Sequence, residues 1–292
     1  MNTIAFFGAT GGCTNACLAY TLLNGYNARA LARTPSKLTA LLLTQPGITQ
    51  KIISNQLEVI EGDATDVESV KKTLIISTDS NNTCTPVSSI ISGVGGTGIM
   101  SFTRETSCQN SKFRVPALPH IELDNPHITE QTTRALLAAL EQIAARFSSF
   151  EEYRAVAPRV TVISTTGNLP GSKDVGFWFR PMYNVLLPIP HADKLQMEKL
   201  LDKEAELGGD GVLAGGLVVV RPSFLMGDHL IPAREGEKEG QRVGLKGVRV
   251  GTERDPAVGY TIPRALVGKW IFEEVIRHGG AQWVGEKVTI TA

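Results

Sequence analysis

The sequence predicts an α/β fold with a doubly wound, mostly parallel sheet, helices on both faces and a small C-terminal substrate region. Short apolar runs of strand length recur along the chain, and the segments between them carry helical periodicity, as expected of successive βαβ units. Two of the runs, 87–92 and 160–164, resemble strands that are buried on both faces of a parallel sheet. The length of 292 residues suits one large domain, so we expect 1–292 to fold as a single unit.

The predicted elements follow the chain in alternation. The strands span 4–7, 28–32, 57–61, 87–92, 160–164 and 217–220, with a closing strand around Val288 and Ile290. The clearest helix signal is a row of apolar residues on one face, formed by Leu136, Leu140, Ile143 and Phe147. A second helix is expected to begin near Lys194, because Asp193 and Gln196 have the spacing of a capping box. A third helix is expected to carry Pro263 in its first turn.

Three segments lack such periodicity. Residues 78–86 are polar and turn-rich, 93–126 form a long glycine- and proline-containing stretch, and 233–242 combine charges with glycines as a solvated loop does. A structureless stretch as long as 93–126 is usually functional. We therefore expect the substrate region to be formed mainly by 95–126, 168–193 and 223–262.

Composition excludes several classes of function. Lys and Arg together number 29, as do Asp and Glu, so the chain has no cationic field for nucleic acid or an anionic membrane. Cys13, Cys17, Cys84 and Cys108 lack metal-ligand spacing, so we expect reduced thiols and no metal site. The apolar run at 4–7 is too short for a signal peptide or membrane span. We expect a cytoplasmic monomer or homodimer whose partner is a small-molecule substrate.

The strongest motif is the glycine-rich turn that follows the first strand. Its residues are Gly8, Ala9, Thr10, Gly11, Gly12, Cys13 and Thr14, and a helical segment follows at once. Such a turn lets main-chain amides and the positive end of a helix hold a pyrophosphate, as in Rossmann-like dinucleotide-binding folds. We assign Gly8, Thr10, Gly11, Gly12 and Cys13 to cofactor binding. Thr14 stands where a third glycine is usual, so strand and helix are expected to approach less closely there.

The end of the second strand predicts the choice of nicotinamide cofactor. A carboxylate at this place would hold the ribose hydroxyls of NAD(H), but the chain has Arg33 instead. A guanidinium can pair with a 2′-phosphate in a forked geometry, which favours NADP(H). Arg29 and Lys37 are interpreted as surface charges.

With the glycine-rich turn, three further segments carry a family resemblance: 62–66 (GDATD), 220–223 (VRPS) and 259–264 (GYTIPR). The chain resembles the atypical short-chain dehydrogenase/reductases, in particular the NmrA-like NAD(P)-binding group that is widespread in fungi. The resemblance implies that Asp63 and Ala64 lie at the adenine and that Gly93, Val94 and Gly95 run beside the cofactor. It also implies that the Arg-Pro turn at 221–222 borders the substrate pocket.

The catalytic residues of that family are only partly present. Short-chain enzymes usually supply a Ser after the fifth strand and a Tyr four residues before a Lys. Here Ser164 and Thr165 stand at the strand end, but the position four before Lys194 is Pro190, which cannot donate a proton.

Other groups must then supply the proton. Tyr183, His191 and Lys194 itself are the candidates, and Lys194 could instead hold the nicotinamide ribose. The structural alternatives are a helix cap for Asp193, a loop residue for His191 and a pocket wall for Tyr183.

The predicted function is an NADPH-dependent oxidoreductase that acts on a small apolar carbonyl or enone compound, an intermediate of secondary metabolism. Two alternatives remain open. The absent Tyr favours a non-redox isomerase, dehydratase or cyclase on the same scaffold, and an NmrA-like regulator would sense NADP(H) without turnover.

Overall fold

The computed structural model describes residues 2–78, 84–103, 118–168, 173–181, 183, 187–232, 245 and 247–292. Its centre is one sheet of eight strands in the order β12-β14-β10-β9-β6-β1-β2-β3. All neighbours pair in parallel except β12 and β14, so the predicted doubly wound sheet is confirmed. The strands are β1 (Thr3–Phe7), β2 (Asn27–Ala32), β3 (Leu57–Glu61), β6 (Ser89–Ser92), β9 (Arg159–Ile163), β10 (Leu217–Pro222), β12 (Arg249–Gly251) and β14 (Lys287–Thr291).

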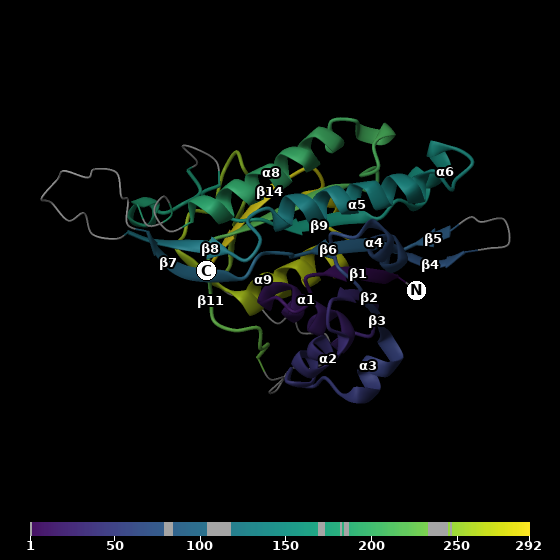
Figure 1. The fold of residues 1–292 in the computed structure, drawn as a ribbon, viewed down its shortest axis with the longest axis horizontal. Coiled ribbons are helices and arrows are strands. Elements are labelled where there is room, and N and C mark those ends of the chain that lie inside the picture. The colour runs from purple at the N-terminus through teal and green to yellow at the C-terminus, as the bar shows by residue number, and fades with distance from the viewer. Residues whose placement is uncertain are drawn as a thin grey trace, which may run out of the picture.

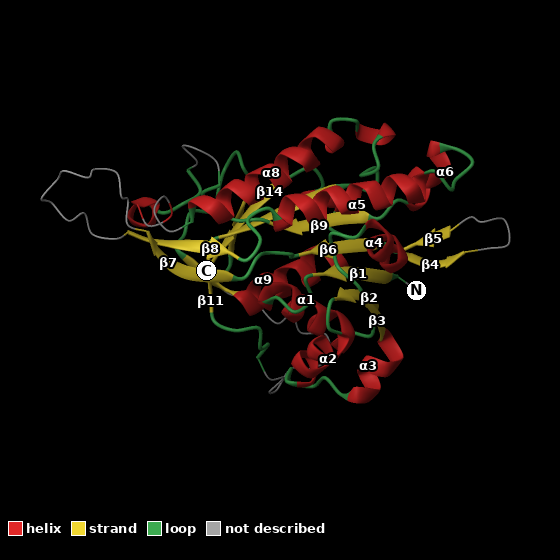
Figure 2. Cartoon of the chain, viewed as in Figure 1, coloured by secondary structure: helices red, strands yellow, loops and turns green. Residues whose placement is uncertain are grey.

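Helices cover both faces of this sheet (Figures 1 and 2). One apolar layer contains α1 (Gly12–Leu23), α2 (Pro35–Leu43), α3 (Gln50–Gln56), α9 (Arg264–Trp270) and the π-helix η3 (Ile271–Arg277). The other layer contains α4 (Val67–Leu74), α5 (Ile128–Ala144), α6 (Phe150–Val156) and α8 (Pro188–Ala205). No helix in the described parts of the chain combines the length and apolar character needed to cross a membrane.

Two segments that the sequence predicted to be irregular contain strands. The stretch 93–126 includes the antiparallel pair β7 (Gly98–Thr103) and β8 (Leu118–Leu123), and residues 104–117 between them lie outside the described residues. The stretch 78–86 includes the end of β4 (Ile75–Thr78) and β5 (Cys84–Pro86), which also pair. Both predictions failed because hairpin pairing, which a one-dimensional pattern does not reveal, satisfies the backbone of polar segments. The predicted loop 233–242 lies outside the described residues.

Two further predictions need correction. Helix α8 begins at Pro188 rather than near Lys194, because proline suits a first helical turn and the apparent capping box lies inside the helix. Arg29 is buried rather than on the surface: its guanidinium donates to the carbonyls of Thr73 (3.0 Å) and Lys72 (3.1 Å) and pairs with Glu58. These partners satisfy a charge that would otherwise be costly to bury.

Candidate active site

A cavity of about 730 Å³ lies at the carboxyl ends of β1, β2, β3 and β6. The chain reverses its winding direction between β1 and β6, which is where open α/β sheets bind their ligands. Residues from α5 and from the turn after β8 form the facing wall. The predicted cofactor residues that line this cavity are Gly8, Thr10, Gly11, Arg33, Asp63, Ala64, Gly93, Val94 and Gly95.

The glycine-rich turn is built by close main-chain contacts. Gly8 has a φ of +72°, and a Cβ at this residue would lie 2.8 Å from the carbonyl carbon of Gly93. The amide of Gly11 donates to the carbonyl of Gly8 over 2.8 Å, which closes the turn before α1. A Cβ on Gly93 would overlap the hydroxyl of Thr14. Because Gly93 has no side chain, there is room for Thr14 in place of the usual third glycine.

Gly12 and Cys13 are not among the residues that line the cavity. A Cβ at Gly12 would overlap the aliphatic part of Arg264, whose Nη1 donates to the carbonyl of Gly227. Burial raises the pKa of the Cys13 thiol to about 12, so this thiol stays protonated. Gly12 thus makes room for a protein side chain from α9.

The part of the cavity that follows β2 and β3 carries opposite charges. Arg33 and Lys37 are exposed at its rim after β2. Asp63 accepts hydrogen bonds from the Thr65 amide (2.8 Å) and hydroxyl (2.7 Å). These bonds and the nearby Arg33 lower the pKa of Asp63. Asp124 accepts from the Thr97 amide over 2.8 Å, and this bond together with Arg33 lowers its pKa also.

Lys194, a predicted cofactor and catalytic residue on α8, is not among the residues that line the cavity, but it contacts one of them. Its Nζ donates to the carbonyl of Ile163 over 2.7 Å and to that of Val94 over 3.1 Å. Burial lowers the pKa of this ammonium to about 8, and the carboxylates of Asp193 and Glu198 oppose the shift. Lys194 is therefore a desolvated cation in contact with a cavity-lining residue.

Tyr183 and His191 lie together near this cation. Their rings are 5.3 Å apart, and His191 is one helical turn before Lys194. Burial raises the pKa of Tyr183, whose hydroxyl bonds with Thr166, and lowers the pKa of His191 to about 4. The His191 Nε2 has no hydrogen-bond partner among the described residues. Near neutral pH the phenol keeps its proton and the imidazole is uncharged.

The two hydroxyls after β9 differ in their partners. Ser164 is buried and donates to the Glu198 carboxylate over 2.5 Å, so its hydroxyl proton is already used in a hydrogen bond within the protein. Thr165 is half-buried and donates to the carbonyl of Thr166 over 3.1 Å.

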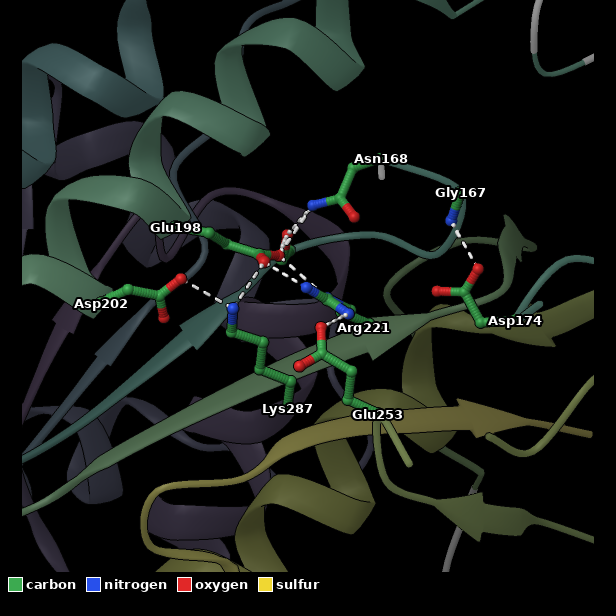
Figure 3. A network of polar contacts seen from close by, with 9 residues as sticks. Gly167, Asn168, Asp174, Glu198, Asp202, Arg221, Glu253 and Lys287 are labelled. Atoms are coloured by element: carbon green, nitrogen blue, oxygen red, sulfur yellow. Dashed lines mark hydrogen bonds and ion pairs between the residues drawn. The ribbon is translucent and has the colours of Figure 1, made fainter. Parts of the chain in front are cut away.

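Glu198 belongs to a buried ionic network that sequence analysis did not identify (Figure 3). Arg221 donates to Glu198 through Nε (3.0 Å) and Nη2, and to Glu253 through Nη1 (2.9 Å). The Arg-Pro segment lies within β10 and Arg221 is 1% exposed, so this arginine is held inside the protein rather than bordering an open pocket. The sequence offered two signals for this network: a glutamate four residues after Lys194 and an arginine in a buried strand.

A second buried network joins the glycine-rich turn to the C-terminal region. The Asn15 amide donates to the Ala9 carbonyl over 2.9 Å and accepts from Gln45 over 2.8 Å. Gln45 also donates to the His229 carbonyl (2.7 Å) and accepts from the Ile231 amide (3.0 Å). The phosphate-binding candidate and the segment 229–231 are therefore connected through two amide side chains.

A mostly parallel sheet of this order, with a glycine-rich turn at its switch point, defines a Rossmann-like α/β fold. Two solved structures are similar to the chain. A wide-type short-chain dehydrogenase/reductase from Veillonella parvula, in complex with NADP, has a TM-score of 0.59 and 14% identity, covering 100% of this chain and 94% of that one. Yeast methylglyoxal/isovaleraldehyde reductase Gre2, complexed with NADPH, has a TM-score of 0.52 and 11% identity, covering 97% and 76%. At such identities the likeness shows the fold.

Sequence relatives define the family. The chain is 48% identical to oxidase pynE of Aspergillus niger, over 99% of this chain and 98% of that protein. It is 39% identical to reductase pytE of Aspergillus terreus, over 99% and 97%. The chain belongs to the family of fungal oxidoreductases that includes these two proteins. No family model matches, and the NmrA-like assignment stays a prediction.

Proposed function

We propose that the protein is an NADP(H)-dependent reductase of a small, apolar carbonyl or enone compound of secondary metabolism. One observation carries the proposal: a single cavity connects Arg33, after β2, with Val94, whose carbonyl accepts from Lys194. One cation in the cavity lining and a second in contact with it suit a nucleotide that carries a 2′-phosphate at one end and a reacting group at the other.

The residues present fit this nucleotide. Gly8 and Gly11 line the cavity without side chains, and α1 begins directly after Gly11, so that the free amides at its start would hold a pyrophosphate. Arg33, together with Lys37, would hold the 2′-phosphate, and Asp63 would lie at the adenine. When bound, NADPH supplies the hydride.

Lys194 is the group we assign to the negative charge that develops on the substrate oxygen. Its ammonium is desolvated, which strengthens its electrostatic effect, and a pKa of about 8 lets it give up a proton near neutral pH. The Tyr183 hydroxyl, paired with Thr166, is a second proton donor, and Thr165 can orient the substrate oxygen. With a pKa of about 4, His191 is uncharged near neutral pH and does not act as the acid.

The substrate class is proposed from the aromatic side chains beyond Tyr183. The Phe179 ring lies 6.4 Å from Tyr183 and from Phe224, and 5.0 Å from Tyr260. Tyr260 is exposed and Phe179 is half-buried, so part of this cluster faces outward. An apolar, flat compound is the ligand that such a wall favours.

Calorimetry with NADPH and NADH tests the cofactor assignment. Arg33→Glu is expected to weaken NADPH binding at least about tenfold and to affect NADH less, because it places a like charge at the 2′-phosphate. Lys51→Glu makes the same charge reversal at an exposed residue outside the cavity and serves as the control. Equal losses for both nucleotides in Arg33→Glu would refute the assignment.

Turnover with simple enones and aromatic aldehydes tests the reaction. A reductase consumes one NADPH for each product formed. Product without NADPH consumption would establish the isomerase, dehydratase or cyclase alternative. Nucleotide binding without turnover of any of these compounds would favour the regulatory alternative.

A further inference from the structure

Two charged side chains of α8, one helical turn apart, contact two consecutive residues at the end of β9. The Lys194 ammonium donates to the carbonyl of Ile163, and the Glu198 carboxylate accepts from the hydroxyl of Ser164. These contacts together fix both the rotation of α8 and its position along β9, because neither side chain can move by a turn without losing its partner.

Glu198 is held from several other directions (Figure 3). Arg221 of β10 pairs with both carboxylate oxygens, the Asn168 amide donates over 2.8 Å, and the Lys287 ammonium of β14 is 3.8 Å away. Glu198 and Arg221 are each 1% exposed. A desolvated carboxylate is tolerated only where its partners are fixed, so this arrangement is rigid.

Stability alone does not require such an ion pair. Apolar residues of similar volume often replace a buried ion pair with little or no loss of stability. An apolar replacement would still pack α8 on the sheet, but it could not accept the hydrogen bonds of Ser164 and Asn168. What the carboxylate adds is therefore a defined place for the strand end that Lys194 contacts.

We propose that Glu198 is a positioning residue for Lys194. It sets α8 against the end of β9 so that the ammonium lies between the carbonyls of Ile163 and Val94, and Val94 lines the cavity in which the nicotinamide ribose would bind. The proposal rests on the assignment of that cavity to NADP(H). Glu198 itself touches neither nucleotide nor substrate and acts through α8 and the strand end.

The test compares two nucleotides that share one end. In the proposed site NADPH would reach Lys194 with its nicotinamide half, which adenosine 2′,5′-bisphosphate lacks. Glu198→Gln is expected to weaken NADPH binding at least about fivefold and to change bisphosphate binding by less than about twofold. Asp202→Asn is the matched control, because Asp202 lies one turn further along α8, is half-exposed and pairs with Lys287. This control is expected to bind both ligands as the unmodified protein does.

A double variant separates positioning from stability. Glu198→Leu combined with Arg221→Met removes both charges and is expected to melt near the unmodified protein while still binding NADPH weakly. Normal NADPH affinity in this stable variant would overturn the proposal. If Glu198→Gln does not fold, the double variant carries the test.

A double-mutant cycle supplies the last readout. In a Lys194→Ala background, Glu198→Gln is expected to cause no further loss of NADPH affinity, since a positioning residue has nothing left to position. Fully additive losses would contradict the proposal. If the unmodified protein bound neither nucleotide, the proposed function itself would fail. If it bound both, but Glu198→Gln did not weaken NADPH binding more than bisphosphate binding, only the positioning proposal would fail.

Discussion

The glycine-rich turn that lines the cavity and the charged residues around α8 are built in different ways. The glycine-rich turn consists of neighbouring residues, and its contact groups are main-chain amides and missing side chains, as at Gly8 and Gly11. The wall around α8 consists of buried or half-buried charged side chains whose partners are distant in sequence: Lys194 contacts Ile163 and Val94. The turn is therefore encoded locally, whereas the wall exists only after the sheet has formed.

This difference separates binding from chemistry. Main-chain amides around a glycine keep the same charge at any pH, so changes in the turn should act on nucleotide affinity. The wall relies on the desolvation of Lys194 and His191, so changes there should act on turnover and on pH dependence.

Removal of Lys194 gives the largest expected effect. Lys194→Ala should lower turnover by about 10²–10⁴-fold, because it deletes the cation assigned to the developing charge. The fold should persist, since replacing this half-buried cation also removes its desolvation cost. Steady-state kinetics and thermal melting measure the two effects. Lys199→Ala, at an exposed residue of α8, is the control, and normal turnover in Lys194→Ala would remove Lys194 from the mechanism.

His191 should make the wall sensitive to acid. Its pKa is about 4 in the fold, below the unperturbed value of 6.5, so the unfolded chain takes up a proton first as the pH falls. The contribution of His191 to the free energy of unfolding is fully present above about pH 6.5. It is lost as the pH falls toward about 4, which lowers the free energy of unfolding by on the order of 3 kcal/mol.

His191→Phe keeps a ring but cannot titrate, so its free energy of unfolding should fall less over that range. Urea unfolding at about pH 7 and about pH 4 measures the difference. His278→Phe, at an exposed histidine, should behave as the unmodified protein. The same acid loss in His191→Phe would show that other groups control it.

The fold could be predicted because strand length and apolar patterning are local properties. The predicted strands correspond to β1, β2, β3, β6, β9, β10 and β14, and the glycine-rich turn follows β1 as expected. The β7–β8 pair was missed because strand pairing depends on partners rather than on periodicity.

The α8 wall could be predicted only in part. The sequence pointed to Lys194 and Ser164, but it could not show that the Ser164 hydroxyl donates to Glu198 inside the protein, or that Arg221 pairs with that carboxylate. Such pairs join residues whose spacing carries no period, so their types alone do not reveal the contact. Arg29 was assigned to the surface for the same reason, since its carbonyl partners lie at the end of α4.

Two adjacent glycines of the turn, Gly11 and Gly12, are expected to differ in what their substitution changes, nucleotide affinity or stability. Gly11 lines the cavity, and a Cβ there would lie 3.1 Å from the Gly8 carbonyl oxygen. Gly11→Val should therefore weaken binding of NADPH and of adenosine 2′,5′-bisphosphate alike, by at least about tenfold. Gly12→Ala should act on melting temperature instead, because its methyl group meets Arg264. Unchanged affinity in a folded Gly11→Val protein would contradict the assignment of the turn to the pyrophosphate.

Asp193 offers the smallest expected effect and joins α8 to the start of α5. Its buried carboxylate caps α5 rather than its own helix, accepting from the amides of Thr129 (2.9 Å) and Glu130 (3.0 Å). Asp193→Ala should cost about 1 kcal/mol of stability, as the loss of a helix cap does. Asp66→Ala removes the exposed cap of α4 and is the control.

The neighbour of those capped amides, Ile128, lines the cavity. A looser start of α5 should therefore also weaken NADPH binding, by about twofold or less. Melting curves with and without NADPH measure both effects on one sample. A loss of stability with no change in affinity would mean that the wall around α8 and the nucleotide cavity respond independently, because the cap is the link through which one would disturb the other.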